Sequence, residues 1–144
     1  MIHARTSIRR WVAATLEDAL VPGTVTRVDT SRVHRYPVYR LPAINVLTAR
    51  EEATEDATRQ SEYREVDVEV AIRVKGGSAL DDQLDQIALE LEAVLLAAPR
   101  PDNVLTVAYA RTDVAQDDSS DQPTGLMQIT YSVLYRVTPG QPVL

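Results

Sequence analysis

The chain has 144 residues, 44% of them hydrophobic, and a formal net charge of −6, which suits one globular domain over residues 1–144. No cysteine is present, which excludes disulfides, thiolate nucleophiles and thiolate metal sites. An acidic chain without a basic cluster is a poor candidate for binding nucleic acid, and no segment approaches the roughly 20 apolar residues of a membrane span.

The first predicted element is an amphipathic helix over residues 3–20, in which apolar side chains recur three and four positions apart. Pro22 and Gly23 end this helix. No apolar stretch follows the N-terminal arginines, so we do not expect a signal peptide. The segments predicted next are a short strand at Thr24–Asp29, an irregular arm through Pro37 and Pro42, and a buried strand at Ala43–Thr48.

Residues Arg50–Glu62 lack a periodic apolar face and are predicted to form a mobile loop. A long strand follows in "EYREVDVEVAIRVKGG", and the two glycines end it. Its apolar positions alternate with polar ones, which predicts one buried and one wet side. The apolar side consists of Val66, Val68, Val70, Ile72 and Val74, and the polar side of Glu65, Asp67, Glu69, Arg73 and Lys75.

A second helix is predicted within "SALDDQLDQIALELEAVLLAAP", which has a clear apolar stripe and ends at Pro99. Ser78 and Asp81 resemble a capping box at its start. The acidic residues of the first turns, Asp81, Asp82 and Asp85, suit the positive end of the helix dipole.

Two strands and a polar loop complete the pattern. The segment "NVLTVAYARTDV" predicts a strand, and Ala115–Gly125 predicts a mobile loop that contains Asp117, Asp118 and Asp121. The final strand, Gly125–Val137, alternates strictly apart from Leu134. Its polar side carries Gln128, Thr130, Ser132 and Arg136.

These elements together predict an α+β fold. Each long strand has one apolar face and each helix one apolar stripe, so they bury one another best when both helices pack on the same face of a sheet. The sheet is expected to be mostly antiparallel (mixed), with four to five strands.

Little in the sequence indicates catalysis. The only histidines, His3 and His34, are interpreted as surface residues, and no nucleophile elbow, P-loop or dinucleotide-binding glycine motif is present. Carboxylates at positions 65–69 and 117–121 leave open a small metal- or ligand-binding enzyme. The basic residues around positions 65–69 favour an ordinary wet sheet face instead, and positions 117–121 a solvated loop. We therefore predict a protein that is not an enzyme and has no metal or cofactor.

Several segments also follow the pattern of a known family. A proline-rich arm leads into "LPAINVLTAREE", and the long strand "YREVDVEVAIRVKG" is followed by the helix "LDDQLDQIALELEAVLLA". The polar loop and terminal strand "DDSSDQPTGLMQITYSVLYRV" end in a Thr-Tyr-x-(apolar)-x-Tyr-Arg pattern over residues 130–136. In this order the chain resembles the tail terminator proteins, or minor tail protein U family, of long non-contractile-tailed phages (siphoviruses), prophages and gene transfer agents.

The resemblance implies a structural protein of the virion tail, assembled in the host cytoplasm, that forms a homohexameric ring on the end of the tail tube. Such a ring stops tube polymerisation and provides the head-attachment surface. Its implied partners are the tail tube protein and a head-completion or connector protein; DNA would pass through the ring without tight binding, and no membrane is involved. A head–tail connector or head-closure protein is the alternative.

The polar strand faces are the expected oligomer and partner interface, because a neighbouring subunit would cover them. The residues are Glu65, Asp67, Glu69, Arg73, Gln128, Thr130, Ser132 and Arg136. The two polar loops are expected to contribute docking residues, namely Arg50, Glu51, Glu52, Asp117, Asp118 and Asp121.

Overall fold

The computed structural model describes residues 1–31, 41–54, 57–117 and 124–144. Two helices and five strands follow one another in this part of the chain. They are α1 (Ala4–Leu20), β1 (Arg27–Asp29), β2 (Ala43–Ala53), β3 (Glu62–Lys75), α2 (Leu80–Ala97), β4 (Val104–Asp117) and β5 (Thr124–Val137).

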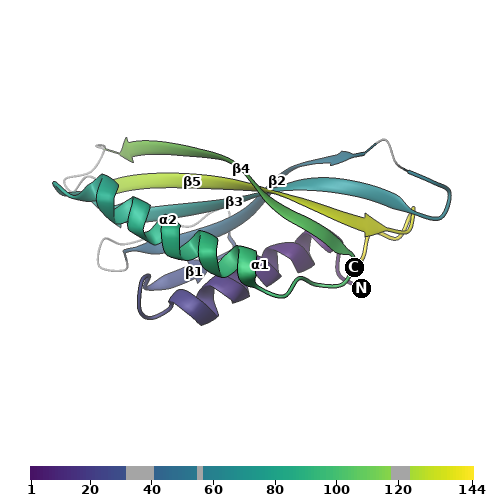
Figure 1. The fold of residues 1–144 in the computed structure, drawn as a ribbon, viewed down its shortest axis with the longest axis horizontal. Coiled ribbons are helices and arrows are strands. Elements are labelled where there is room, and N and C mark those ends of the chain that lie inside the picture. Colours follow the sequence, from purple (N-terminus) through teal and green to yellow (C-terminus); the bar gives the residue numbers. More distant parts are fainter. Residues whose placement is uncertain (32–40, 55–56, 118–123) are drawn as a thin grey trace.

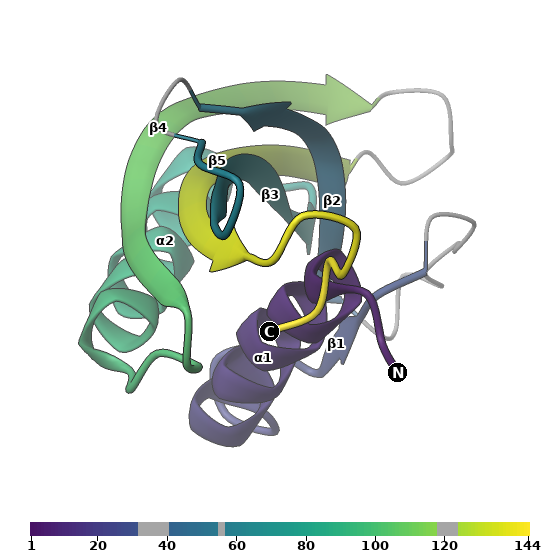
Figure 2. The ribbon, with the colours of Figure 1, turned by 90° about the vertical axis from the view of Figure 1, so that its right-hand side faces the viewer.

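The five strands form one open, strongly twisted sheet in the order β1-β2-β3-β5-β4 (Figures 1 and 2). Only β1 and β2 are parallel; the other neighbours are antiparallel. All residues of β3 pair with β5 without a break in register, from Glu62 opposite Val137 to Lys75 opposite Thr124. Both helices lie on the same side of the sheet, which confirms the predicted α+β architecture.

The core is an aliphatic layer between the helices and one face of the sheet. The helices contribute residues spaced three or four apart, and β3 and β5 contribute every second residue. From α1 and α2 these are Ile8, Val12, Leu16, Leu20, Leu84, Ile87, Leu91 and Leu95. From the two central strands they are Val66, Val68, Val70, Ile72, Val74, Met127, Ile129, Tyr131, Val133, Tyr135 and Val137.

The first and last segments of the chain lie side by side (Figure 1). There the amide of Ala4 donates to the carbonyl of Pro142 at 2.7 Å, so the start of α1 is tied to the segment after β5. In the described residues, no helix is both long and apolar enough to span a lipid bilayer.

Several predicted boundaries are wrong. Arg50, Glu51 and Glu52 do not lie in a loop but in β2, which continues to Ala53, and Glu62 already begins β3. A β-bulge between Thr48 and Glu51 adds a residue and interrupts the alternation, so the sequence pattern of a strand ends although the strand continues.

The same holds at the other end of the sheet. The strand predicted at residues 103–114 extends to Asp117, and the last strand starts at Thr124, so both ends of the predicted polar loop belong to the sheet. The predicted capping box is also wrong, because the N-cap of α2 is Ala79 and no side chain caps it. The strand predicted at Thr24–Asp29 is limited to β1, and most of the proline-rich arm, including Pro37, lies outside the described residues.

Candidate assembly surface

The face of the sheet that points away from the helices, called the outer face below, gathers the residues predicted for the interface. Residues Glu65, Asp67 and Glu69 of β3 lie opposite Leu134, Ser132 and Thr130 of β5. Further along the same two strands, Ala71 is opposite Gln128 and Arg73 opposite Leu126, while Arg136 is opposite Tyr63. Since the intervening residues are buried under the helices, all eight predicted residues share the outer face.

The outer face is acidic near its centre. The side chains of Glu65, Asp67 and Glu69 follow one another along β3, and the hydroxyl of Ser132 donates to Glu65 Oε1 at 2.8 Å. Glu65 and Asp67 also line a small hollow of about 90 Å³ together with Arg50 and Glu52 of β2. Three of these four residues are acidic, so a partner with a basic surface would fit this part of the face.

Thr130 was predicted to be exposed to solvent on the polar side of its strand, but it is buried. Its exposed fraction is 0% in the single chain. The residues opposite it are Glu69 on β3 and Arg111 on β4, and both have longer side chains. A short side chain between two long neighbours is shielded from water, so the predicted contact at Thr130 would need those neighbours to move.

Glu51 has a structural place that the sequence pattern does not reveal. The bulge in β2 turns it towards the helix side of the sheet, opposite Val66, where 11% of its side chain is exposed. There it accepts a hydrogen bond from the hydroxyl of Tyr135 and forms ion pairs with Arg5 Nη1 at 3.4 Å and Arg64 Nη1 at 3.6 Å. Burial raises the pKa of the Tyr135 hydroxyl above its ordinary value, and the hydrogen bond to Glu51 adds to this.

The other predicted docking residues are divided among different places. Arg50 and Glu52 form an exposed ion pair with each other on β2. Asp117 is the last residue of β4. Asp118 and Asp121 lie outside the described residues. The structure therefore brings Arg50 and Glu52 to the outer face, beside the acidic residues of β3, and separates them from Glu51.

Two strand edges are also part of this surface. The strand β4 ends the sheet on one side, and on the other side β1 pairs only with Ala43–Asn45 of β2. Strands β2 and β4 each carry an exposed ion pair between residues two positions apart, Arg50–Glu52 on β2 and Arg111–Asp113 on β4. Sequence reasoning missed Arg111 and Asp113, although their alternation in "ARTDV" was a signal.

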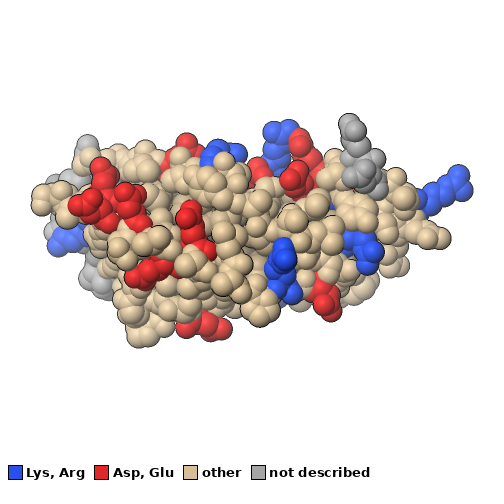
Figure 3. Space-filling view, in the orientation of Figure 1, with Lys and Arg blue, Asp and Glu red and all other residues tan. Residues whose placement is uncertain are grey.

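The ends of the elongated molecule differ in charge. In the view of Figure 3, acidic side chains gather at the end where α2 begins, whereas the basic side chains lie mostly towards the opposite end. Asp81 and Asp82 occupy the first turn of α2. The two ends of the molecule therefore offer chemically different surfaces on the side shown.

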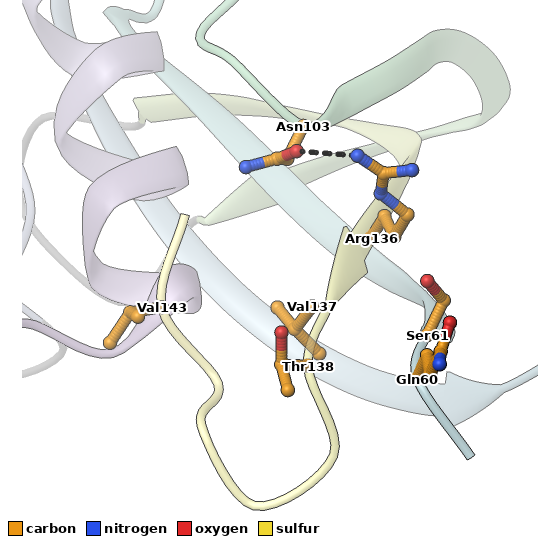
Figure 4. Close-up of a pocket in the computed structure, with 7 residues that line it drawn as sticks. All are labelled: Gln60, Ser61, Asn103, Arg136, Val137, Thr138 and Val143. Atoms are coloured by element: carbon orange, nitrogen blue, oxygen red, sulfur yellow. Dashed lines mark hydrogen bonds between the residues drawn. The ribbon is translucent and has the colours of Figure 1, made fainter. Parts of the chain in front are cut away.

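A hollow of about 340 Å³ lies at the end of β5, and its lining is mostly polar (Figure 4). Arg136 is its one charged residue, and its Nη2 donates to Asn103 Oδ1 at 3.4 Å. The other lining residues are Gln60, Ser61, Val137, Thr138 and Val143. This set lacks a carboxylate or imidazole that could act as a base on either hydroxyl.

Side chains that could bind a metal ion are not clustered in the described part of the chain. There, no group of three or more His, Asp or Glu side chains could hold a metal ion. His3 is the N-cap of α1, where its Nδ1 accepts a hydrogen bond from the amide of Arg5 at 3.1 Å. His34 lies outside the described residues.

Comparison with known proteins adds information about the fold. No protein-family model matches the sequence, and no curated protein is significantly similar to it. The chain is similar in structure to one chain of a structure titled "Virion of native gene transfer agent (GTA) particle", with a TM-score of 0.61 and 14% sequence identity. The alignment covers 88% of this chain and 92% of that chain. At this identity the similarity shows that the two chains share a fold.

Proposed function

We propose that this protein is a structural component of a phage-type virion that forms a ring on the end of the tail tube, stops tube polymerisation and provides the surface for head attachment. The observation that supports this most directly is the shared fold with a chain from a gene transfer agent virion, which extends over nearly the whole length of both chains.

The surface of the subunit suits assembly in a ring. Identical subunits that join through two different surfaces form a closed ring when each contact includes the right rotation. The edges of the sheet could provide two such surfaces, because β2 and β4 lie on different sides of the subunit and each carries an exposed ion pair, Arg50–Glu52 and Arg111–Asp113. Complementary charge of this kind sets orientation and register more than affinity.

A terminator also needs two unlike ring faces. A tube end presents the same surface after each added layer, so growth stops only when a different protein binds to it and offers no site for the next tube subunit. The acidic end of the molecule at Asp81 and Asp82 and its opposite, more basic end could supply these two faces. The tube protein and a head-completion protein are the proposed partners.

Electron microscopy of particles made without the gene tests this proposal. We expect intact heads and separate, unjoined tubes, many of them longer than normal. Tubes of normal length that remain unattached would assign the protein to head closure instead. Tails of normal length on full heads would contradict both functions. Complementation with the unaltered gene is the control.

A further inference from the structure

The strands β2 and β4 each carry one pair of oppositely charged residues near an edge of the sheet. On β2, Arg50 and Glu52 point to the outer face, where they line one hollow with Glu65 and Asp67. On β4, Arg111 and Asp113 point to the same face, because they are opposite Thr130 and Gln128 while the intervening Thr112 is opposite the buried Ile129. Each strand therefore carries one arginine and one acid, two residues apart, on the same face.

These side chains are exposed in the single chain. The exposed fractions are 74% and 57% for Arg50 and Glu52, and 56% and 74% for Arg111 and Asp113. An exposed pair of this kind adds little to the stability of the subunit. Both pairs are therefore available for contacts with another molecule at little cost to the fold.

The backbone beside them is also available. Among the described residues, no strand pairs with the outer edge of β4 at Arg111–Asp113 or with the β1 side of β2 at Arg50–Glu52. Downstream of its second bulge, from Arg111 to Asp117, β4 pairs with β5 residue by residue, so its outer edge is regular. An unpaired backbone edge of this kind is a template for pairing with another chain.

The direction of the strands agrees with a head-to-tail contact. Three successive antiparallel steps lead from β2 through β3 and β5 to β4, so β2 and β4 of one subunit run in opposite directions. When a second copy is placed beside the first in the same orientation, its β4 therefore lies antiparallel to the first copy's β2. The two outer faces then form one continuous surface.

In this arrangement the charges are complementary. An antiparallel register that places Arg50 opposite Asp113 also places Glu52 opposite Arg111. Each charged residue then has an opposite charge across the strand pair in addition to its partner on the same strand. A parallel pairing of the same residues would place Arg50 opposite Arg111 and Glu52 opposite Asp113. Like charges directly opposite each other destabilise a sheet.

We propose that residues 50–52 of one copy pair with residues 111–113 of the next copy, so that the sheet continues from subunit to subunit. This inference rests on the proposed ring, and it names the contact that closes it. Only a few residues pair at each contact, so each contact is weak alone. A weak contact suits a protein that must assemble on a tube end and not in free solution.

A charge swap tests the contact. Arg50→Glu with Glu52→Arg, or Arg111→Asp with Asp113→Arg, preserves the net charge and an ion pair within each strand but places like charges opposite each other between copies. We expect either swap to weaken self-association roughly ten-fold per contact, measured by sedimentation over a concentration series, and the four-residue combination to restore it. Urea unfolding of each variant checks that the fold is retained.

Cross-linking provides a second measurement. The chain has no cysteine, so Arg50→Cys on one copy and Asp113→Cys on another are the only thiols in a mixture. Opposite residues in an antiparallel pair lie about 4.5–5.5 Å apart at Cα, within the range of a disulfide. We expect a disulfide between unlike copies in the assembled protein. Each variant alone is the control.

The outcomes separate the two proposals. Self-association that resists both swaps and yields no mixed disulfide would overturn the strand pairing and leave the ring intact. Absence of self-association of the unaltered protein, alone and on isolated tubes, would overturn the ring and the pairing together.

Discussion

At the scale of single residues, Glu51 shows how a charged side chain is held at the margin of an aliphatic core. It is largely buried and contacts Tyr135, Arg5 and Arg64. Its removal would leave the buried Tyr135 hydroxyl without its acceptor and would take away one of the two ion pairs of Arg64, which also pairs with Glu62. Such groups are costly when they lose a partner.

We therefore expect Glu51→Ala to lower the free energy of unfolding by about 2 kcal/mol, measured by urea denaturation. The matched control is Glu52→Ala, the next residue of the same strand, whose ion pair with Arg50 is exposed. That change should alter stability by no more than about 0.5 kcal/mol. Equal effects of the two substitutions would contradict the structural role of Glu51.

The cap of α1 makes stability depend on pH. The imidazole of His3 accepts the hydrogen bond from Arg5 only when Nδ1 is unprotonated. Partial burial, and then the charge of Arg5, lowers the pKa of His3 from its ordinary value of 6.5. The unfolded chain therefore takes up this proton at a higher pH than the folded chain does.

The sign of the effect follows from linkage. As the pH falls through 6.5, the unfolded state binds the proton first, and the free energy of unfolding decreases until the folded-state pKa is passed. In His3→Asn, asparagine caps the helix without titrating, so this part of the pH dependence should disappear from urea-denaturation curves. An unchanged pH profile in that variant would exclude His3 as its source.

At the scale of elements, the start of α2 sits directly on the start of β5. A Cβ atom at Gly125 would lie 2.7 Å from Cδ2 and 2.8 Å from Cγ of Leu80, the first residue of α2. Only glycine leaves room for this leucine without displacing it. The glycine thus sets how closely the helix approaches the sheet.

Gly125→Ala should destabilise the protein by roughly 1–3 kcal/mol, because the leucine or the first turn of α2 must move. Gly77→Ala is the control, since its Cβ would meet no atom within 4 Å. Thermal or urea unfolding of Gly125→Ala, Leu80→Ala and the double variant forms a double-mutant cycle. The double variant should lose less stability than the sum of the single ones.

The same scale shows what could be predicted from the sequence. Both helices and the long strands β3 and β5 were predictable, because their apolar residues keep a constant period from end to end. The continuation of β2 was not, since its bulge shifts the alternation by one residue. Residues 115–117 show no apolar pattern, because an exposed edge strand needs none.

The candidate surface was predictable in part for the same reason. Alternation alone placed Glu65, Asp67 and Glu69 on one face, and their register with β5 confirms this arrangement. Their role in assembly remains a prediction. Glu51 was wrongly assigned to a docking loop. Its contacts with Arg5 and Tyr135 join distant parts of the chain, so no local sequence pattern reveals them.

At the scale of the whole molecule, the acidic outer face should influence assembly. Glu65 and Asp67 line one hollow with Arg50 and Glu52, which we propose to pair with the next copy. Reversal of Glu65, Asp67 and Glu69 to lysine would place basic side chains beside that contact. We expect weaker self-association in light scattering over a concentration series. Reversal of Asp81, Asp82 and Asp85 on α2 changes the net charge equally and serves as the control. Association that responds equally to both sets would point to net charge alone.

The charge of the proposed ring also bears on DNA. Each copy has a formal net charge of −6, so a ring of copies repels the phosphates of DNA and has few counterions to release from them. We expect weak binding or none in fluorescence anisotropy with duplex DNA at low salt. Tight binding at physiological salt would contradict a lumen through which DNA passes freely.

The position of β5 has a consequence for synthesis on the ribosome. This strand lies between β3 and β4 but is made after both. When β4 has left the exit tunnel, it has no strand to pair with, and β3 has only β2. The sheet therefore closes after translation has passed Val137, when β5 inserts along its full length between the two waiting strands. A chain that stops before Thr124 lacks the strand that joins β3 to β4, so each of these two strands keeps an unpaired edge.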